Sequence, residues 1–180
     1  DSTVRTTIEA TRSACEALAA ELDDSIRDVL LLGIGGSALG PQLVAETLSP
    51  TPAMRHLHVM DNTDPDGMAR TLSRLAPRQT VVLVISKSGS TAETLNGLAL
   101  TSRLYEEADV PLADHCVAIT APGSPLEARA KAEGWRAILP LWDWVGGRTS
   151  VTSAIGLAPG YLLGIAMEEM LEGASAMDEA

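Results

Sequence analysis

Short, continuous apolar runs alternate with longer amphipathic stretches along this chain. Such runs, closed by glycine or polar residues, are typical of strands buried on both faces of a parallel sheet. We predict five of them, at residues 29–32, 57–60, 81–85, 115–120 and 136–139. Because a stretch suited to a helix lies between successive strands, the pattern predicts parallel strands joined by right-handed helical crossovers.

The amphipathic stretches supply the helices. Near the start of the chain an apolar stripe recurs at helical spacing, formed by Ile8, Cys15, Leu18 and Leu22. Capping residues, proline at a first helical position and a terminal glycine predict further helices at residues 64–75, 91–107 and 124–134. Residues 150–171 predict two helical pieces, with interruptions at Gly156 and at Pro159-Gly160.

These elements predict an α/β fold, a three-layer α/β/α sandwich with a five-stranded parallel sheet in the flavodoxin-like order 2-1-3-4-5. The length of 180 residues, with 46% hydrophobic residues, suits one domain with its own core. We find no internal repeat or linker. The chain begins at Asp1 rather than Met, so we expect residues 1–180 to be a single domain excised from a longer polypeptide.

Composition and charge narrow the function classes. A net charge of −11 disfavours a nucleic-acid partner or an anionic membrane surface, because both would repel the chain. No spanning apolar run or signal peptide is visible, so we expect a soluble, cytoplasmic protein. Cys15 and Cys116 show neither disulfide nor metal-ligand spacing, so we expect both to be core residues and expect no metal site. We also expect no cofactor.

The first segment with candidate chemistry is Gly-Ile-Gly-Gly-Ser at residues 33–37, where the first strand turns into a helix. Glycines allow a tight turn, and amide N–H groups at a helix start can bind an anion. Two alternatives remain at this point. The segment can be a plain glycine-rich turn, or a loose dinucleotide fingerprint with Asp61 as the ribose-binding acid.

The second segment is Ser-Lys-Ser-Gly-Ser-Thr at residues 86–91, directly after the third strand. It combines four hydroxyls and an ammonium with a helix N-terminus, which predicts a phosphate site, although serine and threonine are also ordinary helix caps. In the order 2-1-3-4-5 the first and third strands are neighbours whose helices leave to opposite faces. Ligands collect at such switch points, so both loops are expected to hold one phosphate.

The third segment runs from Trp142 to Ser150 and contains Gly146-Gly147-Arg148. The glycines let the backbone bend and aim Arg148 at a phosphate or an enediolate oxyanion. The alternative is that Arg148 only pairs with an acidic neighbour. Trp142 and Trp144 are interpreted as packing residues rather than as a sugar-stacking platform.

Taken together, in this order and spacing, the three blocks resemble the signature regions of the glucose-6-phosphate isomerase family, in its N-terminal SIS-type sugar-phosphate-binding domain. The resemblance implies an SIS-like fold and the interconversion of glucose 6-phosphate and fructose 6-phosphate through an enediol. It implies that Arg148 is catalytic, stabilising the enediolate. It implies that the substrate and its phosphate are held by Gly36, Ser37, Ser86, Lys87, Ser88, Thr91 and Thr94.

The resemblance also implies a hexose 6-phosphate ligand, and a homodimer for the parent enzyme. Residues 88–91 depart from the Thr-Phe-Thr-Thr of many members, which changes the details of that loop. The family's glutamate base, ring-opening histidine and late lysine are expected farther along, outside this chain. Glu93 is interpreted as a helix-start acid, and the three histidines as surface or core-edge residues.

Two other function classes stay open from sequence. A non-catalytic SIS sensor of sugar phosphates would keep both phosphate loops but would not need residues 145–150. A dinucleotide-dependent enzyme is the second alternative, and tight binding of a nicotinamide cofactor without binding of sugar phosphate would identify it.

Overall fold

A parallel sheet with strand order β2-β1-β3-β4-β5 forms the centre of the computed structural model, which describes residues 2–179. The strands are β1 (Asp28–Leu32), β2 (His56–Met60), β3 (Thr80–Ile85), β4 (Cys116–Thr120) and β5 (Ala137–Pro140). Every strand pair is parallel, and each strand begins within one residue of the sequence prediction. The predicted strand order is therefore confirmed.

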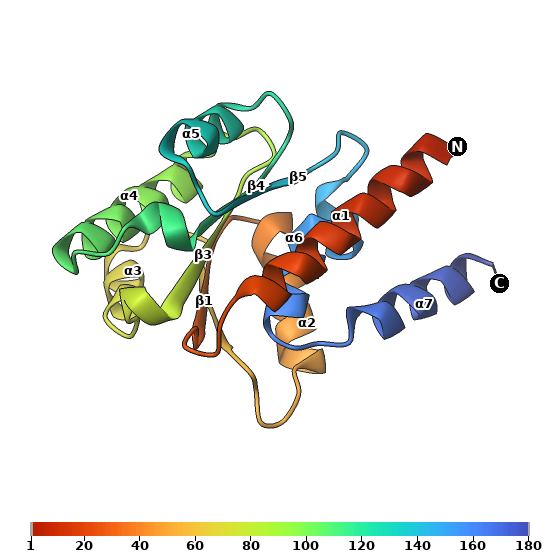
Figure 1. The fold of residues 1–180 in the computed structure, drawn as a ribbon, viewed down its shortest axis with the longest axis horizontal. Helices are drawn as coiled ribbons and strands as arrows, with labels where there is room; N and C mark the ends of the chain where they lie inside the picture. Colours follow the sequence, from red (N-terminus) through yellow and green to blue (C-terminus); the bar gives the residue numbers. More distant parts are fainter. Residues whose placement is uncertain (1, 180) are drawn as a thin grey trace.

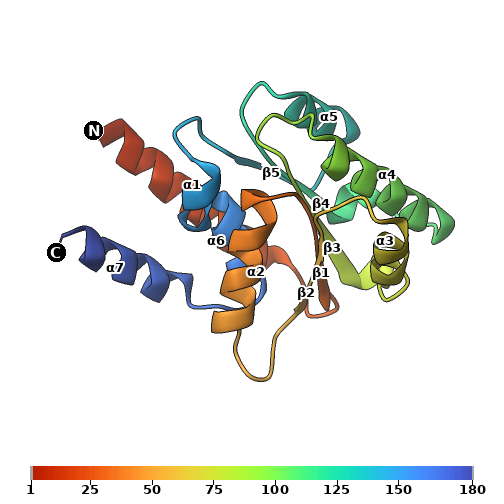
Figure 2. The ribbon, with the colours of Figure 1, turned by 180° about the vertical axis from the view of Figure 1, so that it is seen from behind.

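Helices cover both faces of this sheet (Figures 1 and 2). One face packs against α1 (Ser2–Glu21), α2 (Gly36–Leu48) and α6 (Ala154–Leu162), and the other against α3 (Pro65–Leu72), α4 (Ala92–Glu107) and α5 (Pro125–Glu133). Because successive strand side chains point to opposite faces, Val81 and Leu83 enter the first core and Val82 and Val84 the second. The three-layer α/β/α prediction is confirmed.

The structure contradicts the prediction for one residue of the apolar stripe near the start of the chain, Ile8. Cys15, Leu18 and Leu22 are buried against the sheet, but Ile8 is 47% exposed. Figure 1 shows why: the N-terminal part of α1 projects past the sheet, beside α7 (Met167–Asp178). Helical spacing identified the correct face of α1 but not how far along its length the core extends.

The expected interruptions at Gly156 and Pro159-Gly160 are wrong, because these residues lie inside α6. The chain breaks instead at Gly164, whose φ is 77°. A β-carbon at Gly156 would lie 2.0 Å from the Val151 carbonyl oxygen, and one at Gly160 would lie 2.2 Å from the Met167 sulfur. These glycines therefore allow close packing of α6 rather than ending it.

Both cysteines are fully buried core residues, as predicted, and stand on opposite faces of the sheet. Burial raises the pKa of the Cys15 thiol to about 12, and it also raises the pKa of Cys116 well above its ordinary value. We expect neither thiol to react with an aromatic disulfide reagent at pH 8 in the native chain, and both to react in denaturant. Rapid reaction of one native thiol would show that its side of the core opens easily.

The three histidines lie in or next to the strands and away from the loops at the strands' carboxyl ends. His56 is the first residue of β2, His58 is the third of its five residues, and His115 directly precedes β4. His58 contacts the Asp28 carboxylate at 2.7 Å, and the Nδ1 atom of His115 lies 3.0 Å from the Thr80 carbonyl oxygen. Their placement at the surface and core edge is confirmed. Within the described part of the chain, no helix is both long and apolar enough to span a membrane.

Candidate functional site

A cavity of about 770 Å³ opens at the carboxyl ends of β1, β3, β4 and β5. It collects the loops that follow these strands, including the switch point between β1 and β3, where α2 and α4 leave to opposite faces. The predicted site residues that line it are Gly36, Ser37, Ser86, Lys87, Ser88 and Thr91. The fold thus brings the first two sequence segments together in one place.

Two helices begin at this cavity without a capping side chain. The N-cap of α2 is Gly35, and the N-cap of α4 is Thr91, whose hydroxyl does not bond to its own helix. In contrast, Asp64, Ser124 and Ser153 cap α3, α5 and α6 through side-chain oxygens. No side-chain oxygen caps the first N–H groups of α2 or α4, although the Ser37 and Ala38 amides of α2 donate to the backbone oxygens of Ile34 and Gly35. The positive ends of two helix dipoles therefore meet at one cavity.

The loop after β3 is held in shape by its own hydroxyls. The Ser86 and Thr91 hydroxyl oxygens lie 2.8 Å apart, and the Gly89 amide donates to the Ser86 hydroxyl at 3.1 Å. Gly89 has a φ of 70°, which favours glycine over other residues. Ser88 and Ser90 are joined at 3.1 Å through their hydroxyls. The loop is therefore a compact turn with a dense set of hydroxyl donors.

Lys87 connects this loop to the third segment. Its ammonium donates to the backbone oxygens of Asp143 at 2.7 Å and Val145 at 3.1 Å, on either side of Trp144. An ammonium has three donors, so two are used and one is left for an anion in the cavity. Trp142 and Trp144 stack on each other with ring centres 5.5 Å apart, and Trp144 is 56% exposed, so their interpretation as packing residues stays a prediction.

The first and third segments touch through their backbones. A β-carbon on Gly36 would lie 2.2 Å from the Gly147 carbonyl oxygen, so only glycine fits there. The buried Ser150 hydroxyl lies within hydrogen-bond distance of the carbonyl oxygens of Gly36, at 3.0 Å, and Gly147, at 2.9 Å. The turn that carries Arg148 is thus fixed to the start of α2.

Arg148 and Thr94 do not line the main cavity. Arg148 is exposed and borders an adjoining groove of about 540 Å³, which shares Gly36 and Gly147 with the cavity. Within residues 2–179 its guanidinium has no carboxylate partner, so the simple ion-pair alternative receives no support. Thr94 is 2% exposed, and its hydroxyl has no hydrogen-bond partner among the described residues.

Sequence reasoning missed the fourth wall of the cavity. Residues 121–125, the turn between β4 and α5, line it opposite the first loop. Glu127 accepts the Gly123 amide at 2.7 Å, and its contacts, first with Lys131 and then with Gly123, lower the pKa of this carboxyl. Gly-Ser-Pro at residues 123–125, after a predicted strand, is a signal for this wall as well as for the cap of the next helix.

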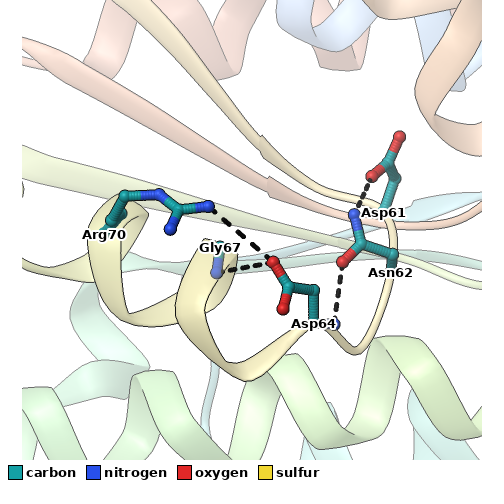
Figure 3. A network of polar contacts seen from close by, with 5 residues as sticks. All are labelled: Asp61, Asn62, Asp64, Gly67 and Arg70. Atoms are coloured by element: carbon teal, nitrogen blue, oxygen red, sulfur yellow. Dashed lines mark hydrogen bonds and ion pairs between the residues drawn. The ribbon is translucent and has the colours of Figure 1, made fainter.

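Asp61, the acid required by the dinucleotide alternative, belongs to a separate turn after β2 (Figure 3). Its carboxylate accepts a hydrogen bond from the Asn62 side-chain nitrogen at 2.9 Å. The Asn62 side-chain oxygen in turn accepts from the Asp64 backbone N–H. Asp64 then caps α3 by accepting the Gly67 amide at 2.8 Å. These residues form a cap for α3 and do not line the cavity.

The described lining of the cavity is formally neutral, although the chain as a whole carries a net charge of −11. Among the described residues that line it, Lys87 is the one cation and Asp143 the one carboxylate, and Asp143 contacts Lys87 through its backbone oxygen. No cluster of potential metal ligands occurs within residues 2–179. Attraction for an anion therefore comes from Lys87, hydroxyls and helix N-termini rather than from net charge.

Comparison with known proteins agrees with this geometry. The family profile described as Phosphoglucose isomerase matches residues 2–180. A glucose-6-phosphate isomerase from Synechococcus sp. (strain JA-3-3Ab) is 51% identical over 168 residues, which is 92% of this chain and 32% of that protein. One from Geobacter sp. (strain M21) is 53% identical over 84% of this chain and 29% of that protein. The chain spans about a third of the length of these curated relatives.

Solved structures show the same likeness. A hypothetical protein from Thermus thermophilus superposes with a TM-score of 0.82 at 36% identity, over 96% of this chain and 40% of that chain. A glucose-6-phosphate isomerase from Chlamydia trachomatis gives a TM-score of 0.78 at 29% identity, over 87% of this chain and 30% of that chain.

Proposed function

This chain belongs to the phosphoglucose isomerase family, and we propose that its cavity binds the phosphate of a hexose 6-phosphate. The observation that carries the proposal is the meeting of two uncapped helix N-termini with Lys87 and the serine-rich loop. A phosphate supplies charged acceptor oxygens to these helix N-termini, to the free donor of Lys87 and to the hydroxyls of the loop. Ser37, Ser86, Ser88 and Thr91 are its proposed hydroxyl ligands, and Gly36 lies beside the sugar.

We propose that the whole protein interconverts glucose 6-phosphate and fructose 6-phosphate. In this reaction a proton moves between C2 and C1 while negative charge develops on a substrate oxygen. Arg148 is the proposed oxyanion stabiliser, because it sits on the turn fixed to Gly36 and has no carboxylate partner among the described residues. Lys87 donates to the Val145 carbonyl oxygen, directly before that turn. Thr94 is buried at the start of α4, and we propose that it stabilises the loop that binds the phosphate.

Proton transfer requires a base within hydrogen-bond reach of the substrate carbon-bound proton. Asp143 is the one carboxylate among the described lining residues, and Glu93 does not line the cavity. The family resemblance implies a glutamate base and a ring-opening histidine farther along the polypeptide, so we propose that these groups, rather than Asp143, come from a part of the enzyme beyond this domain. We also propose a cytoplasmic homodimer for the whole enzyme, for which the exposed Leu39 and Leu43 on α2 leave an apolar face available.

Calorimetric titration with glucose 6-phosphate tests the phosphate site. We expect the 180-residue chain to bind this ligand, and Lys87→Met to weaken binding on the order of 10- to 100-fold, the usual effect of losing a hydrogen bond to a charged group. The chain's other lysine provides a matched control, because Lys131 lies on α5 and pairs with Glu127. Lys131→Met should bind as the wild type does. No binding by the wild type would reject the proposed function, and equal binding by Lys87→Met would remove Lys87 from the site.

A further inference from the structure

Two hydroxyls behind the phosphate loop form a chain of hydrogen bonds that ends on Ser86. Thr120, the last residue of β4, is 1% exposed, and Ser124, the N-cap of α5, is 7% exposed. The Thr120 hydroxyl donates to the Ser86 carbonyl oxygen at 2.6 Å and lies 2.7 Å from the Ser124 hydroxyl. The Glu127 amide donates to the Ser124 hydroxyl at 3.1 Å.

Donor counting fixes the direction of this chain. A hydroxyl has one hydrogen, and that of Thr120 is used on the Ser86 carbonyl, which can only accept. Ser124 must therefore donate to Thr120, while it accepts from the Glu127 amide. Both hydroxyl hydrogens, those of Thr120 and Ser124, are therefore used. The two hydroxyls and the Ser86 carbonyl are buried, and an unpaired donor or acceptor is costly in a buried place.

The chain determines how one peptide plane of the phosphate loop is oriented. Both the amide and the carbonyl of Ser86 face β4, since the amide donates to Ile119 at 3.1 Å and the carbonyl accepts from Thr120. In a planar trans peptide the carbonyl and the following N–H point in opposite directions. The Lys87 N–H therefore points away from β4 toward the side of β1, where Gly36 and Ser37 line the cavity.

The turn between β4 and α5 also packs directly against the loop of residues 86–91. A β-carbon on Gly89 would lie 2.8 Å from the Leu126 amide nitrogen and 2.9 Å from the Ser124 β-carbon. The Ala121 amide donates to the Lys87 carbonyl at 3.2 Å. The start of α5 is thus a template against which residues 86–91 are shaped.

We propose that Thr120 and Ser124 are positioning residues, which orient the Lys87 N–H and the loop of residues 86–91 toward the phosphate. Thr120 itself does not contact the ligand. The inference rests on the proposed function of the cavity. It deepens that proposal by adding residues of β4 and α5 to a site built from the β1 and β3 loops. Loss of the Thr120 hydroxyl frees the Ser86–Lys87 peptide to rotate, so an N–H donor is no longer held toward the cavity.

The test compares Thr120→Val with Thr101→Val. Thr101 is equally buried, on α4, and donates to the Gly97 carbonyl at 2.9 Å, so its loss controls for removing a buried hydroxyl. Thr120→Val should lower the Tm of the chain more than Thr101→Val, because it leaves the Ser86 carbonyl and the Ser124 hydroxyl unpaired, whereas the Gly97 carbonyl keeps its helical N–H donor. Only Thr120→Val should weaken binding of glucose 6-phosphate and inorganic phosphate, by about 5- to 10-fold, the range of one net hydrogen bond. Thr120→Ser, which keeps the hydroxyl, should restore affinity to within about 2-fold of the wild type.

Amide hydrogen exchange of residues 86–91 gives a readout that needs no ligand. Exchange should be faster in Thr120→Val than in Thr101→Val, and Ser124→Ala should show the same change if Thr120→Val does not fold. Unchanged exchange in the loop, or equal affinities in the two threonine variants, would overturn the positioning role. Failure of the wild type to bind either ligand would reject the proposed function instead, and the exchange comparison would still decide the role of Thr120.

Discussion

Gly36→Ala is expected to destabilise the chain by about 2 to 3 kcal/mol and to abolish measurable binding of glucose 6-phosphate. The new β-carbon would meet the Gly147 carbonyl oxygen at 2.2 Å and the Gly147 carbonyl carbon at 2.7 Å. Both are backbone atoms, so no side chain can rotate away to relieve the overlap. The start of α2 must separate from the turn that carries Arg148, and the Ser150 bond to Gly36 is lost.

The partner glycine of this contact is a matched control. A β-carbon on Gly147 would meet no atom within 4 Å, so Gly147→Ala should leave the free energy of unfolding within about 0.5 kcal/mol of the wild type. Denaturant titration of both variants measures the difference. Equal stability of Gly36→Ala and Gly147→Ala would show that the two loops are not in close contact in solution.

Arg55→Met is expected to lower the free energy of unfolding by about 3 kcal/mol, because it leaves buried carbonyl acceptors without a donor. The Arg55 side chain is 5% exposed and donates to the carbonyl oxygens of Leu162 at 2.8 Å, Ile26 at 3.2 Å and Leu22 at 3.5 Å. Two of these carbonyls lie at the C-terminal ends of α6 and α1, where the helix dipole favours a cation. Burial lowers the pKa of the guanidinium, but arginine remains protonated.

Two further variants separate this role from the loss of a positive charge. Arg55→Lys keeps the charge but cannot reproduce the planar set of donors, so we expect it to recover only part of the lost stability. Arg70→Met removes an exposed arginine 3.8 Å from Asp64 (Figure 3), and its cost should stay below about 0.5 kcal/mol. Thermal or denaturant unfolding measures all three. If Arg55→Met were as stable as Arg70→Met, water would be replacing the guanidinium at these carbonyls.

The sequence was sufficient for the sheet and for two walls of the site, because both depend on local patterns. A strand buried on both faces needs a continuous apolar run, and 81–85 has the strongest of these. Loops that follow neighbouring parallel strands must meet at the same edge of the sheet, so strand order alone brought Ser37 and Ser86 to one cavity. The family resemblance agreed with these inferences, and the match to residues 2–180 confirmed it.

The tertiary structure alone decided the features that depend on contacts between distant segments. Gly156 and Gly160 looked like helix breaks, yet they are packing sites, since nothing local shows that Val151 and Met167 press against α6. Likewise the sequence contains no sign that Lys87 reaches the carbonyl oxygens of residues 143 and 145.

The fourth wall of the cavity and the hydrogen bonds of Thr120 and Ser124 behind residues 86–91 also depend on contacts between distant segments. Local rules identify Ser124 as the cap of α5, which it is, but its second hydrogen bond joins a residue of β4 whose own hydroxyl reaches the loop after β3. Apolar periodicity and capping rules describe how a segment folds by itself. Which polar groups satisfy one another across segments is set by the packing of the whole sheet, and in this protein that packing determines where Arg148, Lys87 and Thr120 lie.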